Sequence, residues 1–425
     1  MRGVRCERVR ARLRLGLRRM RGEREVSNKK NTIMKRLVLC LVLAILAIGA
    51  RGQSDTARVA LNGYVKNLQS LYFFNGSFPD LRQFKLVDTV LQDNLLHWRL
   101  NFNWRMASHL NLNAGLRTRV FYGDLVKATP LYADQIDAGS NDWVDLSTVW
   151  LDKRGFVGHS VLERLYLEYT KDQLEIRLGR QRVNWGISTI WNPNDIFNAY
   201  SFTDFDYEER PGSDALRVRY YTGYAGSVEV AVRGADSLGG MIMAGRWLFN
   251  KGSYDIQLIG GYAQKDLVLG GGWAGNIKNA GFKGEATWFY RPEDKESVFA
   301  LTANVDYAFA NSLYLNGGFL YNSAGATDQD ILNLFTFDLS ARNLYPYRWA
   351  TFVQGSYPVT PLLNAGVAVI YSPVKVHPLF VNPTFTLSIS DNWTLDAVGQ
   401  VVLSKGDEGY RSPLQVAFLR VKVNY

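Results

Sequence analysis

LHWRLNFNWRM, residues 96–106, alternates apolar and polar side chains without interruption. One face carries Leu96, Trp98, Leu100, Phe102, Trp104 and Met106, and the other carries His97, Arg99, Asn101, Asn103 and Arg105. Strict alternation over about ten residues predicts a β-strand. Charged side chains at such density cannot face a dry protein core, because a buried charge without a partner costs too much free energy. The polar face of this strand therefore needs water.

Two architectures satisfy that requirement. A soluble antiparallel sheet buries its apolar face in a core and leaves its polar face to solvent. A membrane barrel turns its apolar face to lipid and its polar face to a wet lumen. The alternation continues through residues 110–120 and recurs along the chain in segments close to the ~9–11 residues of a tilted membrane strand. Aromatic residues such as Tyr122, Tyr169 and Tyr290 stand at the segment ends, as in the interfacial girdles of barrels.

These segments predict an all-β fold, an antiparallel up-and-down transmembrane β-barrel of about 18 strands. Short connections alternate with longer ones, which is the rule for turns at one rim of a barrel and loops at the other. Sixteen strands remain open if one weak hairpin, 225–249 or 267–290, is misassigned. The predicted strands are 58–73, 93–106, 109–122, 161–170, 173–182, 215–221, 225–233, 241–249, 253–263, 267–276, 280–290, 298–309, 312–322, 348–357, 362–372, 379–389, 393–403 and 414–425.

The final segment, residues 417–425, alternates with Tyr425 on its apolar face. A last strand that ends in an aromatic residue resembles the terminal signal of outer-membrane proteins, which their assembly machinery reads. The resemblance implies the outer membrane of a Gram-negative bacterium, with outer-membrane lipid and the barrel assembly machinery as partners. Tyr425 is then the expected assembly signal.

The first 52 residues follow a different pattern. Residues 1–33 carry twelve Lys or Arg and three Glu, and a basic Met34-Lys35-Arg36 then precedes an apolar run over 37–49. A basic region followed by a short apolar run is typical of a secretory signal. We expect residues 1–33 to be an extension ahead of the true initiator, 34–52 a signal peptide and 53–425 the outer-membrane barrel. A basic nucleic-acid arm is the alternative for residues 1–33.

The excess of basic over acidic residues comes from residues 1–52. Removing the +9 of residues 1–33 and the +3 of Lys35, Arg36 and Arg51 turns the formal charge of +10 into −2 for residues 53–425. The composition therefore gives no reason to expect a nucleic-acid partner. Both cysteines precede residue 53, so the mature chain offers no disulfide or Cys–metal framework.

Enzyme motifs are weak. The histidines have no metal-ligand spacing, and no G-x-S-x-G motif is present. Gly270-x-Gly272-x-x-Gly275 matches the dinucleotide fingerprint only as a string, because no strand-to-helix context surrounds it; it indicates a strand where backbones lie close. We expect no enzyme activity, no cofactor and no metal. An outer-membrane lipase or protease, with His159 at its rim, is the less favoured alternative.

Basic side chains concentrate on the polar face of the early strands and the last one. The expected pore-lining basic wall comprises Lys66, Arg99, Arg105, Arg117, Arg119, Arg164, Arg177, Arg217, Arg219, Arg233, Arg420 and Lys422. Two interpretations remain open. The wall draws anionic or polyhydroxyl solutes past it, or its arginines pair with Glu168, Glu175 and Glu229 and merely tie neighbouring strands together.

The long connection Val183–Asp214 is rich in large apolar residues. A loop of this length is uncommon unless it is functional, and its apolar side chains would not float in water. We expect it to fold into the barrel mouth and narrow it, with a turn at Asn192-Pro193-Asn194-Asp195 and Asp195 as the N-cap of a helix. The expected constriction residues of this loop are Trp185, Trp191, Asn192, Asp195 and Phe197.

Gly179-Arg180-Gln181, followed by Asn184-Trp185-Gly186 and Asn192-Pro193-x-Asp195, resembles the G-R-Q-x-x-x-W-G segment of Gram-negative outer-membrane channels related to alginate-export and porin-type barrels. The aromatic-rich loops and Gly-rich strands also resemble proteins of Bacteroidetes-type bacteria. The first resemblance implies a passive channel for small hydrophilic solutes, with an anionic or saccharide-like preference left open. It also implies that Arg180 and Trp185 are constriction or scaffold residues. A structural, adhesive or secretion-accessory barrel without an open pore is the alternative. The sequence leaves the solute, the direction of transport and the oligomeric state undetermined.

Overall fold

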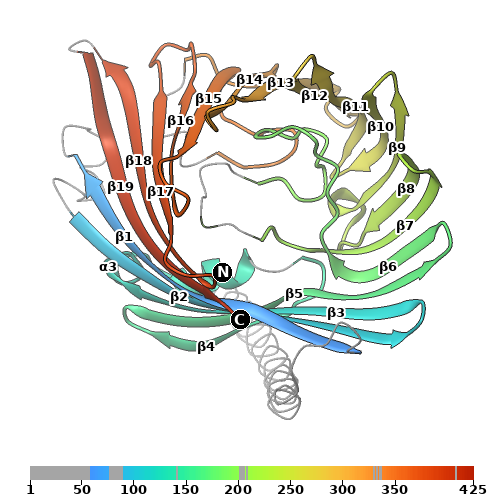
Figure 1. Cartoon of the computed structure of the whole chain (residues 1–425), viewed down its shortest axis with the longest axis horizontal. Helices are drawn as coiled ribbons and strands as arrows, with labels where there is room; N and C mark the ends of the chain where they lie inside the picture. The colour runs from blue at the N-terminus through green and yellow to red at the C-terminus, as the bar shows by residue number, and fades with distance from the viewer. Residues whose placement is uncertain are drawn as a thin grey trace, which may run out of the picture.

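The computed structural model describes residues 58–75, 90–139, 142–200, 206, 209–328, 331, 334, 337–406 and 409–425. The strands wrap into a ring around a lumen, with the first and last strands side by side (Figure 1). The predicted leader and signal peptide, residues 1–52, fall outside the described residues and stay predictions. Among the described residues, no helix has the length and apolar content to cross a membrane.

The sheet is a closed antiparallel barrel of 18 strands, as the alternation predicted. Its members are β1 (Val59–Phe74), β2 (Val90–Ala107), β3 (Leu110–Gly123), β5 (Phe156–Lys171), β6 (Leu174–Gln181), β7 (Ser213–Gly223), β8 (Gly226–Arg233), β9 (Ile242–Lys251), β10 (Tyr254–Ala263), β11 (Asp266–Ile277), β12 (Ala280–Arg291), β13 (Glu296–Ala308), β14 (Tyr314–Asn322), β15 (Trp349–Pro358), β16 (Leu363–Tyr371), β17 (Leu379–Ser388), β18 (Trp393–Gly406) and β19 (Gly409–Asn424). Pairing of β1 with β19 closes the ring. The sixteen-strand alternative is excluded.

One further strand, β4 (Ser147–Lys153), lies in the connection expected to be a plain loop at 123–160. It pairs with the first half of β5, while β6 pairs with the second half, so β4 continues the wall above β6. The short helices α3 (Asp124–Ala128) and α4 (Tyr132–Ala138) occupy the same connection. The prediction missed this strand because it is too short to cross a membrane and exists only to satisfy the free edge of β5.

Tight turns join the strands at the end of the barrel that carries both termini of the ring, which we call the turn end. Asp172, Gly252, Ser253 and Lys278 have positive φ there, the conformation that two-residue hairpins require. The opposite end carries the long connections, and we call it the loop end. It also contains one tight turn at 264–265, the short connection seen in the sequence.

The outer surface of the barrel is apolar. Trp98, Trp247, Leu269, Val353 and Phe385 are each more than a third exposed, although residues of this kind are normally buried in soluble proteins. On β2 the alternate residues His97 and Arg99 point inward and are buried. A continuous apolar belt around a closed barrel matches a lipid-facing surface.

Tyr425 closes the seam between the first and last strands. Its backbone pairs with Gly63 of β1, and its hydroxyl accepts a 2.6 Å hydrogen bond from Trp98 Nε1 and donates a 2.9 Å bond to the carbonyl oxygen of Arg99. A Cβ atom at Gly63 would lie 2.7 Å from the Tyr425 hydroxyl, so the ring needs a glycine beneath it. The side chain is half exposed on the outer face, where the predicted assembly signal must lie.

The inner face divides along the barrel axis. In the turn half, β13, β15 and β17 present Thr302, Asn304, Gln354, Thr384 and Thr386 to the lumen. In the loop half, the inward positions of the same strands are buried apolar residues: Val298, Ala300, Ala350, Phe352 and Phe380. The rule that polar side chains face the lumen therefore holds for the turn half of these strands and not for the loop half, because connections from the loop end fold inward and pack there.

Candidate functional site

The connection between β6 and β7 is called the inner segment below; its described residues, 182–200, 206 and 209–212, lie inside the ring of strands (Figure 1). Its described part contains no helix or strand. Without regular structure its backbone groups need other partners, because a buried N–H or C=O without one is costly. Those partners come from the barrel wall.

Trp185 anchors the start of the segment. The indole is fully buried, donates a 2.6 Å hydrogen bond to Glu229 of β8, and packs edge-on against Phe197 with the ring centres 5.0 Å apart. Gln257 of β10 donates a 2.8 Å bond to the Trp185 carbonyl oxygen. Small inward residues of the wall, Ala215, Ala231 and Ala244, leave room for this cluster. Trp185 and Phe197 therefore fix the segment against β7–β10.

Glu285 of β12 holds the middle of the segment. Its carboxylate accepts backbone hydrogen bonds from Ile187, from Ser188 at 2.8 Å and from Asn194 at 2.9 Å. Thr287, two residues along the same strand, donates a 2.7 Å bond to the Asn194 side chain. Three donors on one charged acceptor make a strong tether, because hydrogen bonds to charged groups exceed neutral ones.

Glycines in β11 let the segment lie flat on the wall. A Cβ at Gly270 would come within 2.5 Å of the Asn194 side-chain oxygen, and one at Gly272 within 2.8 Å of Ile187 Cδ1. Asn194 also donates to the Gly271 carbonyl oxygen at 2.9 Å. The Gly270-x-Gly272 string is thus a close-approach surface, in agreement with its interpretation as a strand where backbones lie close.

Trp191 holds the next part of the inner segment against β15. Its ring packs against Tyr345 and Phe352, with centres 5.8 Å and 6.4 Å apart. Tyr345 belongs to the connection between β14 and β15, which also folds inward and contributes the buried Ile331 and Leu344. Two connections from the loop end therefore share one apolar cluster inside the barrel.

The end of the segment reaches the opposite wall. Asp206 contacts Lys66 of β1 at 2.8 Å and Arg420 of β19 at 3.3 Å, and Glu209 pairs with Arg99 of β2. Lys66 lies midway along β1, as Glu285 does along β12. The inner segment is therefore held at the middle of the barrel, deeper than the mouth, where the sequence placed it.

Asp195 sits in the predicted turn at Asn192-Pro193-Asn194, but no helix follows over residues 196–200, so the N-cap prediction was wrong. Its backbone N–H donates to the Asn192 carbonyl oxygen at 3.0 Å, and Arg210 lies 3.5 Å from its carboxylate. The side chain is completely buried, and this burial raises the pKa of Asp195 to about 7 despite the nearby guanidinium. Asn192 is also buried, and Gly186 packs directly against it.

Arg180 is a clamp at the loop end of β6. Its guanidinium makes two hydrogen bonds to Asp214 at 2.8 and 2.7 Å and a third to the Val144 carbonyl oxygen, while Asp214 accepts from the Val144 N–H at 2.7 Å. The side chain thereby joins both ends of the inner segment to the strand-bearing connection before β5. Of the two roles considered for Arg180, the geometry is that of a scaffold residue.

The basic wall is present, and most of its members have carboxylate partners. Glu163 contacts Arg99 and, at 2.7 Å, Arg117; Glu229 contacts Arg219 at 2.5 Å and Arg246 at 3.1 Å. Further pairs are Arg177–Glu168, Arg177–Glu175, Arg217–Glu175, Arg233–Asp142 and Arg420–Asp396. The pairing interpretation of this wall therefore describes the geometry, with more acids than the sequence had singled out.

The remaining members are less alike. Arg119 Nη2 lies 3.2 Å from His159 Nδ1, and Arg164 donates to the Arg210 carbonyl oxygen at 2.5 Å. Lys422 lies over the Tyr64 ring at 5.7 Å. Arg105 is exposed at the turn end, beside a small cavity lined also by Arg58 and Asn111. The wall is a set of local environments rather than one continuous charged strip.

The alternation of β5 did not predict that Glu163 pairs with the basic wall, because this strand contains a β-bulge. The register of β3 with β5 shifts between Gly115 and Leu116, which leaves Glu163 unpaired between Leu162 and Arg164. A bulge turns an extra side chain to the same face, and Glu163 reaches Arg99 and Arg117. Simple alternation gives no signal for such a shift.

His159, the residue named for an enzyme alternative, is buried in β5. Asp137 of α4 contacts His159 Nε2 at 3.3 Å and also accepts a hydrogen bond from Ser147. The hydrogen bond from His159 lowers the pKa of Asp137. The Asp137 carboxylate lies between the Ser147 hydroxyl and the His159 imidazole. Activation of a serine nucleophile requires the imidazole to contact the serine directly. No group of three His, Cys, Asp or Glu that could hold a metal ion occurs within the described ranges.

Solved barrels share this fold at low sequence identity. Pseudomonas aeruginosa OccK9 (OpdG) matches with a TM-score of 0.56 and 10% identity over 86% of this chain and 98% of its own. Acinetobacter baumannii OccAB4 matches with 0.55 and 10% over 87% and 99%, and Pseudomonas aeruginosa OpdQ with 0.55 and 7% over 88% and 99%. No protein-family model and no curated protein matches the chain.

At these identities the likeness establishes the fold. The closed 18-strand barrel, its apolar outer belt and its solved counterparts agree with the expected location in the outer membrane of a Gram-negative bacterium. The chain has the architecture of the porin-like barrels, and the more specific relation to alginate-export channels, like the Bacteroidetes-type origin, stays a prediction.

Proposed function

We propose that this chain is an outer-membrane channel for passive diffusion of small hydrophilic solutes, with the inner segment setting the bore. One observation carries the proposal. The segment is fixed at mid-height to walls on opposite sides of the lumen, by Glu285 on one side and by Lys66 and Arg420 on the other. An inward fold held at that depth narrows the path for solutes.

The preference for anionic or saccharide-like solutes rests on two features of the lining. Arginines dominate β2, β3 and β5–β9, and amide and hydroxyl side chains dominate the turn half of β13–β17. Because carboxylates accompany most arginines, we expect an anion preference of only a few-fold; one unpaired charge contributes ~1 kcal/mol at 4 Å in water. Salt near 1 M screens such a field beyond ~3 Å.

Planar-bilayer conductance with reversal potentials in a salt gradient tests the proposal. We expect an open pore with a weak anion preference at low salt that fades at high salt. Replacing Arg117 and Arg119 together with Gln should reduce the preference, whereas Arg154→Gln in the exposed β4–β5 turn should not.

Folded barrels that never conduct would refute the channel and favour a structural, adhesive or secretion-accessory barrel. Conducting barrels that prefer cations at low salt would leave the channel standing and exclude the anion preference. Recognition of Tyr425 by the assembly machinery is a separate proposal, supported by the outward position of this residue at the seam.

A further inference from the structure

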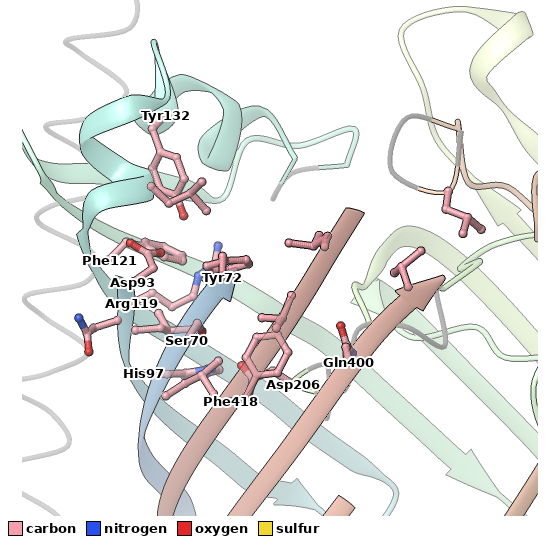
Figure 2. A pocket seen from close by; sticks show the side chains of 18 of the residues that line it. Ser70, Tyr72, Asp93, His97, Arg119, Phe121, Tyr132, Asp206, Gln400 and Phe418 are labelled. Atoms are coloured by element: carbon pink, nitrogen blue, oxygen red, sulfur yellow. The ribbon is translucent and has the colours of Figure 1, made fainter. Parts of the chain in front are cut away.

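A cavity of about 500 Å³ lies in the loop half of the lumen, above the inner segment. Figure 2 shows side chains from three parts of the chain converging on it: Tyr72 and His97 from the first strands, Tyr132 from α4, and Phe418 from β19. Asp206 of the inner segment lies at its base. Its volume is within the ~300–1,000 Å³ range of small-molecule sites.

The lining of this cavity is divided. One side is apolar and comes from β17–β19 and the connection before β15, with Tyr345, Phe380, Val402, Val416 and Phe418. These residues are buried or half-buried inside the barrel, away from the lipid-facing belt. A fully hydrophilic solute gains nothing from such a wall, whereas an apolar ring displaces poorly bound water from it.

The other side is polar and comes from β2 and β3. Arg119 lies over the Phe121 ring at 5.0 Å and offers guanidinium donors. His97 is buried, and within the described chain neither its Nε2 atom nor the Asp93 Oδ1 atom has a hydrogen-bond partner. Buried polar atoms of this kind normally find a partner. A ligand that carries hydrogen-bonding groups on its rim would satisfy both.

The charges of the lining favour a neutral ligand. Asp206 is neutralised by Lys66 and Arg420, and Arg117 is paired with Glu163. The Asp93 carboxylate and the Arg119 guanidinium also line the cavity, and their charges are of opposite sign. The Asp93 carboxylate would repel an anionic group that approaches Arg119. The Arg119 guanidinium would likewise repel a cationic group that approaches Asp93. A neutral hydroxyl group of a ligand can accept a hydrogen bond from the Arg119 guanidinium and donate one to the Asp93 carboxylate.

We propose that this cavity is a binding site for neutral ring-bearing solutes that carry hydroxyl groups, of the aryl-glycoside or phenolic type. The inference rests on the proposed channel, since such solutes reach the cavity through the lumen. The ring lies against Phe380 and Phe418, and the hydroxyl groups face Arg119, His97 and Asp93. The Tyr132 hydroxyl lies at the loop end of the cavity, where burial raises the pKa of Tyr132 and keeps it protonated as a donor.

Equilibrium dialysis of the refolded barrel in lipid nanodiscs, with empty nanodiscs as the blank, tests the site. Three matched probes separate the contributions: phenyl β-glucoside, methyl β-glucoside without the ring, and phenyl β-glucuronide with a carboxylate. We expect phenyl β-glucoside to bind more tightly than either of the others. Equal affinity of the two glucosides, or tighter binding of the glucuronide, would overturn the proposal.

Variants locate the binding. Phe418→Ala should weaken phenyl β-glucoside binding about 5-fold, the size of effect typical of one aromatic contact. Phe418→Leu keeps an apolar side chain and should give an intermediate loss, which guards against a folding defect. Phe385→Ala is the control, because Phe385 is half exposed on the lipid face of β17. Unchanged affinity in Phe418→Ala would place any binding elsewhere and refute this site.

Single-channel recording on the same preparation separates the two proposals. Barrels that bind the aryl glucoside but never conduct would refute the channel and leave the site. Barrels that conduct but do not discriminate between the phenyl and methyl glucosides would refute the site and leave the channel.

Discussion

Removing the carboxylate of Glu285 should release the inner segment from the wall. Glu285 accepts three backbone N–H groups, from Ile187, Ser188 and Asn194. Each hydrogen bond to a charged group contributes about 1.5–3 kcal/mol. Because the three share one acceptor and are not additive, we take about 3–6 kcal/mol for the set, or more than a hundredfold in the docking equilibrium. Glu285→Ala should therefore shift much of the population to an undocked segment.

Glu285→Gln provides a graded test. Its amide keeps one acceptor oxygen but turns an NH₂ group toward a backbone N–H, which leaves a buried donor without a partner at a cost of about 1–3 kcal/mol. We expect single-channel conductance to rise in the order wild type, Gln, Ala, with growing current noise. Glu293→Gln is the matched control, because Glu293 is exposed and makes only a 3.5 Å surface pair with Lys265.

Limited trypsin digestion gives a second measurement that does not depend on conductance. Cleavage after Arg182, identified by mass, should be slow in the wild type and fast in Glu285→Ala. If Glu285→Ala folds and shows the conductance and the digestion pattern of the wild type, Glu285 does not hold the segment and the proposed control of the bore is wrong.

Three further outcomes are expected. Gly270→Val should displace Asn194 and raise conductance, whereas Gly271→Val should not, because a Cβ at Gly271 has only ordinary contacts at 3.6 Å and beyond; equal conductance in the two would contradict the close-approach role. Tyr425→Phe should keep the yield of heat-modifiable barrel but lower its unfolding temperature, because it loses the hydroxyl bonds to Trp98 and Arg99, while Tyr425→Ala should lower the yield as well. The segment should become more protease-sensitive as pH rises from 5.5 to 8, since the raised pKa of Asp195 favours docking while the carboxyl is protonated and that stability is lost as pH rises through about 7; Asp195→Asn should reduce this slope.

The strands were predictable because their signal is local. Lipid on one side and water on the other impose a period of two, and each membrane strand carries that period in its own residues. Residues 96–106 therefore indicate β2 without knowledge of any neighbour. The same logic fails for β4, since Ser147–Lys153 forms a strand only because β5 leaves an edge unpaired beyond the reach of β6.

The partners of the basic wall were not predictable from the strands. Asp206 and Glu209 come from a connection whose fold depends on the finished barrel, and they meet Lys66 and Arg99 across more than a hundred residues of sequence. Glu163 needs a bulge to reach its arginines. Glu285 was readable as an inward-facing acid on β12, but its role depends on backbone N–H groups, which carry no side-chain signature.

One signal in the sequence did mark the filled half of the lumen. Where a barrel strand faces water on its inner side, the inward positions should be polar, as Thr302 and Asn304 are on β13. Closer to the loop end, the same face of the same strand carries Val298 and Ala300, and both are buried against the inner segment's cluster. Alternation that turns apolar on both faces near a rim therefore indicates protein, rather than water, inside that rim. The apolar residues of the inner segment and the apolar rim positions of β13 and its neighbours are two halves of one interface, and each predicts the other.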